Sequence, residues 1–263
     1  IPFGDYVMVY GYQLELQVAD LPLGLFFVLA LSGLAIYGVF LGGWASKNNF
    51  ALLGALRGAA QMVSYEVVLG LTLVGLMMIY GSASLQNMVR AQGGLLFGFV
   101  PAWGVVYQPF AFILFLVAST AENKRTPFDL VEGESEIIGY FMEYSSMRFA
   151  AFMFAEFIEI VLISMLIATL FFGGWQVPYL YESGFIFPGG KELPLNHYLV
   201  SAMQVGSFTV KTVFFSWFSL VVRWTLPRFR FDQMMSLCWK ALLPLALLNI
   251  LITGAVMLAL GKL

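Results

Sequence analysis

Six carboxylates are concentrated in one short segment of an otherwise apolar chain. The segment "AENKRTPFDLVEGESEIIGYFMEY", residues 121–144, holds six of the 15 acidic residues of the sequence. Like charges this close together titrate as a coupled set, so the segment indicates a site that takes up and releases protons. Hard cations also bind clustered carboxylates, but the segment lacks a glycine-bearing ligand loop of known spacing, so we expect no metal site. The six residues are Glu122, Asp129, Glu132, Glu134, Glu136 and Glu143.

A charge run of this kind is usually a solvated loop. Here, however, the acids alternate with apolar residues that a solvated loop does not need, among them Phe128, Leu130 and Val131. We therefore expect the loop, residues 122–147, to fold against the rest of the chain or beneath a docked subunit. Three basic residues are near enough in sequence to offset part of the repulsion: Lys124, Arg125 and Arg148.

Other ionisable residues lie inside long apolar stretches, where they are costly unless they face protein or water. Glu66 and Lys211 each interrupt such a stretch, and Glu122 closes one. Glu156 and Glu159 are three residues apart, so a helix places them on one face. Structural ion pairs, or side chains that reach the membrane interface, explain Glu159 and Arg223 most easily. For Glu66, Glu122, Glu156 and Lys211 the hypothesis is a proton relay.

The stretch "LLGALRGAAQMVSYEV" distributes its polar residues over two faces of a helix. Arg57, Gln61 and Tyr65 follow one another at intervals of four and share one face. Glu66 is nine residues from Arg57, which places it about 180° away around the helix. Any partner of Glu66 must therefore come from another helix.

These residues must be positioned by membrane-spanning helices. The chain is 60% hydrophobic and 11% charged, whereas soluble domains average about 45–50% and about 25%. A spanning helix needs about 20 apolar residues. We therefore predict an all-α polytopic helical bundle, one membrane domain over 1–263 with about six spans: 21–44, 59–80, 104–122, 148–173, 198–224 and 238–260.

Basic residues predict how this bundle is oriented. One set of loops and helix ends holds nine of them, against three on the other side, and an excess of lysine and arginine marks the cytoplasmic side. The acidic loop lies on the side of the nine. The nine are Lys47, Arg57, Lys124, Arg125, Arg148, Arg223, Arg228, Arg230 and Lys240, and the three are Arg90, Lys191 and Lys262.

The residue types limit which cofactors this chain can hold. A single cysteine, Cys238, and a single histidine, His197, exclude an internal disulfide, a cysteine-ligated cluster and a bis-histidine haem. The net charge of −2 gives no indication of a nucleic-acid partner. We expect no metal or flavin bound by this chain.

Four motifs resemble one protein family along nearly the whole sequence. They are "AENKRTPFDLVEGESEIIGYFMEYSSMRFA", "ALRGAAQMVSYEV", "FFGGW" and "VKTVFFSWFSLVVRWTLPRFRFDQMMSLCWKALLP". Their residues and order resemble the H subunit of NADH-quinone oxidoreductase, respiratory complex I, the counterpart of mitochondrial NADH dehydrogenase subunit 1. That family normally has eight spans, and the sequence resembles it from the end of the second span onward. The resemblance therefore lacks the N-terminal span and the amphipathic helix of the family.

The resemblance implies a role in coupling quinone reduction to proton translocation. Quinone would be the bound substrate, while NADH, FMN and iron–sulfur clusters would belong to partner subunits: the peripheral-arm subunits of the quinone site, with small membrane subunits leading to antiporter-like ones. The implied location is the cell inner membrane, or the mitochondrial inner membrane for an organellar protein. By position, the quinone chamber and coupling loop would include Arg57, Arg125, Asp129, Glu132, Glu134, Glu136, Glu143 and Arg148, and the proton path Glu66, Glu122, Glu156 and Lys211.

Two alternatives remain open at this point. The related membrane subunits of hydrogenase-type complexes share this architecture, and a stand-alone ion transporter could use the same buried acids. A transporter works alone, whereas a coupling subunit purifies with a large hydrophilic partner set. Purification behaviour therefore distinguishes a coupling subunit from a stand-alone transporter.

Overall fold

Long apolar helices make up most of the structure, a computed structural model that describes all residues except 11, 97–99, 132–138, 182–183, 187–191 and 262–263. Five helical stretches in the described part are long and apolar enough to cross a membrane. This confirms a polytopic helical membrane protein. The five stretches are Gly24–Ala45, Asn49–Tyr80, Ser146–Phe171, His197–Thr225 and Phe231–Ala259.

The first two spans follow each other at a short turn. The first consists of α1 (Gly24–Gly33) and α2 (Ala35–Ala45), and the second is α3 (Asn49–Tyr80). Asn48 begins α3 because its side-chain oxygen accepts a hydrogen bond from the Phe50 N–H at 2.9 Å. Gly81 ends it in the left-handed region, with φ of 65°. The helix therefore starts earlier than residue 59, where hydropathy places its apolar part.

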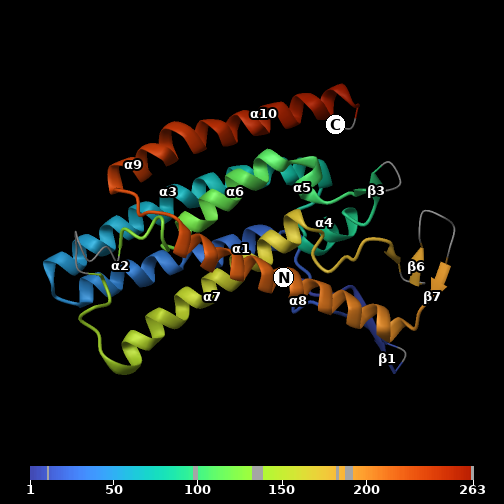
Figure 1. Cartoon of the computed structure of the whole chain (residues 1–263), viewed down its shortest axis with the longest axis horizontal. Helices are drawn as coiled ribbons and strands as arrows, with labels where there is room; N and C mark the ends of the chain where they lie inside the picture. Colours follow the sequence, from blue (N-terminus) through green and yellow to red (C-terminus); the bar gives the residue numbers. More distant parts are fainter. Residues whose placement is uncertain (11, 97–99, 132–138, 182–183, 187–191, 262–263) are drawn as a thin grey trace.

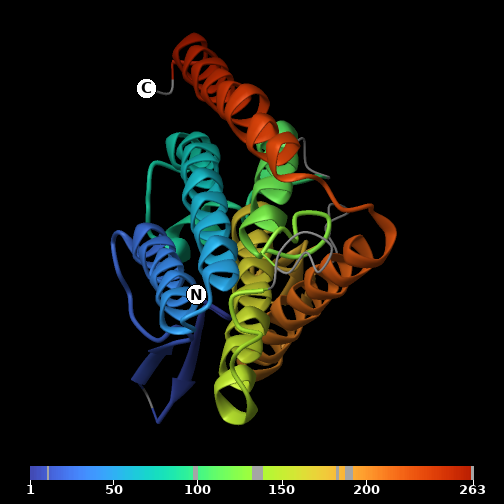
Figure 2. The same cartoon turned by 90° about the vertical axis from the view of Figure 1, so that its left-hand side faces the viewer.

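The third predicted span is shorter than the others. It consists of α5 (Gly104–Tyr107) and the 14-residue α6 (Pro109–Glu122). At about 1.5 Å per residue α6 rises about 21 Å, less than the hydrocarbon core of about 30 Å. It lies inside the bundle beside α3 (Figure 2). Glu122 closes the helix, as its position at the end of the apolar stretch predicts.

The remaining spans are α7 (Ser146–Phe171), α8 (His197–Thr225) and a composite last helix. That last helix runs from α9 (Phe231–Leu237) through the π-helical turn η1 (Cys238–Leu242) into α10 (Leu243–Ala259). Helix α3 lies at the centre, since it packs against α2, α6 and α10, while α7 packs along α8 (Figures 1 and 2).

The segments that join helices differ at the two ends of the bundle. At the end that we name the basic end lie the α2–α3 turn, the segment after α6 and the α8–α9 connection (Figure 1). At the opposite end lie α4 (Leu85–Ala91) and three small antiparallel sheets that add to the helical fold. Their strands are β1 (Tyr6–Val9), β2 (Tyr12–Glu15), β3 (Leu95–Leu96), β4 (Val100–Pro101), β5 (Leu180–Tyr181), β6 (Gly184–Ile186) and β7 (Glu192–Pro194).

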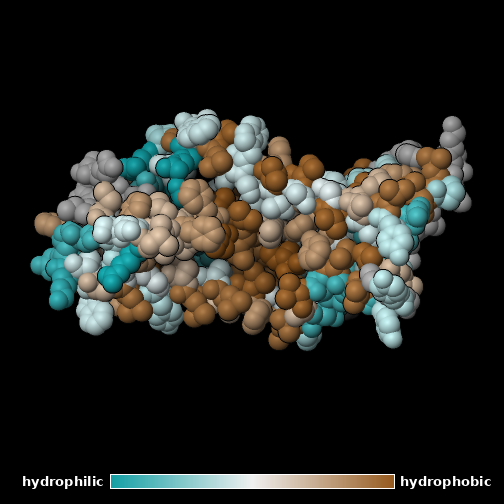
Figure 3. Space-filling view, turned by 90° about the horizontal axis from the view of Figure 1, so that it is seen from below, coloured by the Kyte–Doolittle hydropathy of each residue, from teal (hydrophilic) through white to brown (hydrophobic). Residues whose placement is uncertain are grey.

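The outer surface between the two ends is apolar. Figure 3 shows hydrophobic side chains in a broad band across the middle of one face of the molecule. Large exposed apolar residues on α7 and α8, such as Phe154, Ile158 and Val213, add to the apolar outer surface. Such a surface suits contact with lipid tails, because each helix satisfies its own backbone groups.

Candidate functional site

Two buried ion pairs connect the segment after α6 to α7. Lys124 Nζ lies 3.7 Å from Glu159 Oε2, and Arg125 Nη2 lies 3.1 Å from Glu156 Oε2. The side chains of Lys124, Glu156 and Glu159 are between 4% and 9% exposed, and Arg125 is 14% exposed. The shared face of Glu156 and Glu159 is thereby confirmed. It points at two consecutive cations rather than at lipid.

Two further carboxyl groups lie near these pairs. Glu122 is buried at the end of α6, close enough to Glu159 and Glu66 for their charges to act on it. Glu66 faces α1, since a Cβ added at Gly33 would lie 2.5 Å from Glu66 Oε1. Among the described residues neither Glu66 nor Glu122 forms an ion pair. We name Glu66, Glu122, Lys124, Arg125, Glu156 and Glu159 the carboxylate cluster.

The other polar face of α3 fixes the path of the chain around this cluster. Gln61 donates two hydrogen bonds from Nε2, to the Ala121 carbonyl at 2.6 Å and the Phe128 carbonyl at 2.8 Å. Tyr65 OH donates to the Met234 carbonyl at 3.0 Å, and Arg57 lies over the Phe231 ring at 5.5 Å. The predicted separation of the two faces is confirmed, because Tyr65 and Arg57 contact the last helix whereas Glu66 faces α1.

The start of the acidic loop is also bound to the α8–α9 connection. Arg228 donates from Nη2 to Asp129 Oδ2 at 2.9 Å, and the Phe229 N–H donates to the Pro127 carbonyl. The rings of Phe128 and Phe229 stack at 5.3 Å. These contacts hold Asp129 against the α8–α9 connection.

A cavity opens between α1–α2 and α7 beside the cluster. It measures about 440 Å³ and is largely apolar, with charged groups on one side. The charged lining residues are Lys124, Glu156 and Glu159, and Tyr140 adds a hydroxyl that donates to Glu156 Oε1 at 3.5 Å. A cavity of this size and lining can hold a small ligand or several water molecules.

The cluster retains hydrogen-bonding capacity that the described residues do not use. Glu159 Oε1 and, on the neighbouring turn, Asn123 Oδ1 are buried and accept no hydrogen bond from the described residues, and Glu156 Oε2 contacts Arg125 Nη2 at 3.1 Å as an ion pair without hydrogen-bond geometry. Buried acceptors of this kind are normally satisfied by water or by a ligand donor. Within the cluster four carboxyl groups share two cations, so it can hold protons as well as ion pairs. No metal-binding group of three or more histidine, cysteine or acidic residues occurs in the described part of the chain.

The other predicted loop residues are not part of this buried group. Glu143 and Arg148 are exposed at the basic end, where the side-chain amide of Asn48 donates to Glu143 Oε1 at 2.7 Å. The predicted acids Glu132, Glu134 and Glu136 lie outside the described residues.

Lys211 lies apart from the carboxylate cluster. Its ammonium donates to three backbone carbonyls, those of Phe172, Gly174 and Gln176, at 2.7 to 2.9 Å, and it lies 4.8 Å from the centre of the Trp103 ring. Thirteen positions separate Phe172 from Glu159, which is about 20 Å of helix rise. The cation also complements the negative end of the α7 dipole. We name Lys211 and these three carbonyls the lysine clamp.

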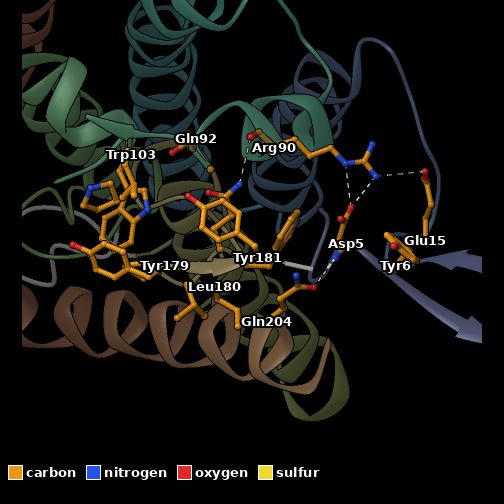
Figure 4. A pocket seen from close by; sticks show the side chains of 18 of the residues that line it. Asp5, Tyr6, Glu15, Arg90, Gln92, Trp103, Tyr179, Leu180, Tyr181 and Gln204 are labelled. Atoms are coloured by element: carbon orange, nitrogen blue, oxygen red, sulfur yellow. Dashed lines mark hydrogen bonds and ion pairs between the residues drawn. The ribbon is translucent and has the colours of Figure 1, made fainter. Parts of the chain in front are cut away.

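A second cavity lies at the opposite end, near the lysine clamp. It measures about 650 Å³. Figure 4 shows Trp103 and Tyr179 on one side, with Arg90, Asp5 and Glu15 on the other. Arg90 donates to Asp5 Oδ1 at 2.8 and 3.1 Å. Partial burial disfavours the charged form of Arg90, but the hydrogen bond from Arg90 to Asp5 and the charges of Asp5, Glu15 and Asp20 together outweigh it and raise the pKa of the guanidinium. Arg90 is thus a fixed cation.

The structure adds residues that sequence reasoning did not place in the site. Lys124 pairs with Glu159 inside the bundle. Of the two simpler explanations for Glu159, the structural ion pair is confirmed and the position at the membrane interface is not. The spacing of three residues between Glu156 and Glu159 predicts that both lie on one helix face, and this could have placed Glu159 in the site. Tyr140 and Arg228 had no signal in the sequence, because their contacts depend on how the loops fold back.

Comparison with known proteins identifies the family. A family model described as NADH dehydrogenase matches residues 1–254. The NADH-quinone oxidoreductase H subunit 2 of Geobacter sulfurreducens is 47% identical over 259 residues, which cover 98% of this chain and 70% of that protein. The NADH-quinone oxidoreductase H subunit of Thermomicrobium roseum is 46% identical over 98% of this chain and 70% of that protein. The resemblance of the four motifs is confirmed: the chain belongs to the NADH dehydrogenase family that includes these two proteins.

Proposed function

We propose that this chain is a membrane subunit of a proton-translocating NADH:quinone oxidoreductase. It contributes to the quinone chamber and couples quinone reduction to proton movement through the carboxylate cluster. The basic end faces the cytoplasm, or the matrix in a mitochondrion, and binds the subunits that carry FMN and iron–sulfur clusters. The membrane is the cell inner membrane or the mitochondrial inner membrane. The names of the relatives support the complex, and the cluster supports the coupling role.

The observation that carries the coupling role is the imbalance of charge in the cluster. Glu66, Glu122, Glu156 and Glu159 share only Lys124 and Arg125 among the described residues. A buried site keeps charges only where they are paired, so Glu122, which is buried, is suited to binding a proton, with the half-buried Glu66 beside it. The cluster borders the cavity of about 440 Å³, which connects this proton-binding capacity to a space that a ligand or water can enter.

Quinone reduction at the basic end then acts on the carboxylate cluster, because the oxidised and reduced quinone interact differently with its charged groups. Reduction of a quinone consumes protons and changes the charge near the segment after α6. Lys124 and Arg125 exchange partners or strengthen one pair at the expense of the other, and the carboxyl groups release or take up a proton in response. A ligand moves such an equilibrium only as far as its interactions with the two states differ.

The test replaces one surplus carboxyl group and leaves both ion pairs intact. Glu122→Gln removes a proton site and keeps the shape of the side chain, and we expect quinone reductase turnover and the linked proton uptake to fall by about tenfold or more. Both are measured in vesicles that contain the assembled complex. Asp232→Asn is the matched control, because Asp232 pairs with Arg230 at the basic end but is 73% exposed.

Two results would overturn the proposal. One is equal, near-wild-type turnover and proton uptake for Glu122→Gln and Asp232→Asn. The other is ion transport by the purified chain alone in liposomes, which would identify a stand-alone transporter.

A further inference from the structure

A third cavity lies near the opposite end of the bundle, between α3, α6 and α10, and has no part in the proposed coupling. It measures about 390 Å³. Apolar side chains such as Ile79, Phe110, Ile252 and Val256 make up most of its lining. Ile252 and Val256 are also 54% and 51% exposed on the apolar outer face of α10, so the cavity adjoins the lipid.

One wall of this cavity carries uncharged polar groups whose orientation is fixed. The Thr253 hydroxyl donates to the Asn249 carbonyl at 2.7 Å, so its oxygen accepts the 2.8 Å hydrogen bond from Gln108 Nε2. Gln108 Oε1 therefore faces away from Thr253. Among the described residues Gln108 Oε1, Asn249 Nδ2 and the Tyr80 hydroxyl are buried and have no hydrogen-bond partner.

The unused acceptor and the unused donor lie beside the same glycine. A Cβ added at Gly75 would lie 2.9 Å from Gln108 Oε1 and 3.3 Å from Asn249 Nδ2. Gln108 and Asn249 are only 5% and 7% exposed. Gln108 and Asn249 both line the cavity, so a hydroxyl group on the cavity side of these two atoms would donate to Gln108 Oε1 and accept from Asn249 Nδ2, which a carbonyl oxygen alone cannot do.

We propose that this cavity binds a membrane amphiphile that carries a hydroxyl group at its polar end and an alkyl chain. The hydroxyl satisfies Gln108 and Asn249, and the chain lies along Ile252 and Val256. Water alone would satisfy the polar wall but not fill the apolar remainder, because apolar cavities stay dry. A hydroxyl-bearing glyceride and a lipid-soluble hydroquinone share this chemistry.

The test is photolabelling in native membranes that carry the full chain. The probe is a long-chain fatty alcohol with a diazirine in its tail, and its methyl ether is the comparison compound. Loss of the donor should lower labelling of α10 peptides by about three- to tenfold for the methyl ether. Asn249→Leu should bring labelling by the alcohol down to the level of the ether.

Matched tryptophan variants separate this site from general contact with lipid. Ile252→Trp fills the cavity and should lower labelling by about tenfold, while Leu251→Trp should leave it unchanged. Leu251 is the adjacent residue, is 72% exposed and does not line the cavity. Competition by dioleoylglycerol would identify a glyceride as the occupant, and competition by a decyl hydroquinone would identify a hydroquinone.

Equal labelling by the alcohol and the ether would overturn the proposal, since Gln108 and Asn249 would then be satisfied by water or by each other. Equal labelling of Ile252→Trp and Leu251→Trp would overturn it as well. Neither result bears on Glu122, so failure here is distinguishable from failure of the coupling role.

Discussion

The carboxylate cluster and the lysine clamp place buried charge in the same bundle by different means. In the cluster, Lys124 and Arg125 are paired with side chains, and carboxyl groups remain in surplus. In the clamp, Lys211 is held by three backbone carbonyls at the end of α7. Side-chain partners can lose or gain a proton, whereas backbone carbonyls cannot. We therefore propose that the cluster changes its charge and that the clamp keeps its shape.

The largest effect that separates the lysine clamp from the carboxylate cluster is expected when the charge of Lys211 is removed. Lys211→Met leaves three carbonyls without their donor, and we expect a loss of about 4 kcal/mol or more in the free energy of unfolding. The measurement is the thermal stability and the amount of assembled complex. Lys240→Met is the control, because Lys240 is an exposed lysine of the last helix. A Lys211→Met complex of normal stability that fails only in proton uptake would place Lys211 in the proton path instead.

A double-mutant cycle across one ion pair tests the cluster. Glu156→Gln leaves the buried Arg125 cation without its carboxylate and should lower stability by about 3 kcal/mol. Adding Arg125→Gln removes the unpaired charge, so the double variant should be more stable than the sum of the two single effects by about 1–3 kcal/mol. Turnover should not recover, since the proton site is gone. Additive stability effects would show that the pair at 3.1 Å is not a coupled unit.

The smallest change moves a carboxyl group without altering any charge. Gly33→Ala adds a methyl group against Glu66 Oε1, and the flexible carboxylate can shift to make room. We expect stability within about 1 kcal/mol of the unmodified chain and turnover lowered between about two- and tenfold. Gly38→Ala is the matched control, because nothing lies within 4 Å of a Cβ added there. Identical turnover for both variants would show that the position of Glu66 does not matter.

Hydropathy and helix periodicity predicted much of the fold and of the site. The predicted span 198–224 corresponds to α8 at His197–Thr225. Glu122 closes its helix, and Glu66 lies on a different face from Arg57 and Gln61. These features depend on neighbouring residues in one helix, so the sequence contains enough information to predict them.

Features that depend on how loops fold back could not be predicted. Proximity in sequence predicts that Lys124 and Arg125 offset charge of the acidic loop, and the charge of Lys124 does act on Glu122. Sequence does not indicate that both cations also pair with carboxylates of α7. Nothing in the order of residues indicates that Lys211 meets the carbonyls after α7. The break between α5 and α6 could have been predicted from Pro109, which lies at the start of α6. Hydropathy averaged over a window of apolar residues does not reveal such a break.

A single side-chain amide joins α4, α5 and the end of α7 at the opposite end of the bundle. Gln92 donates from Nε2 to the carbonyls of Met88 and Thr169, and its Oε1 accepts from the N–H groups of Gly104 and Gly173. Opening any one of these segments breaks a contact that the other segments share. In hydrogen exchange, the amide protons of Gly104 and Gly173 should therefore exchange slowly and at similar rates. Local unfolding would then reach α4 and α5 last.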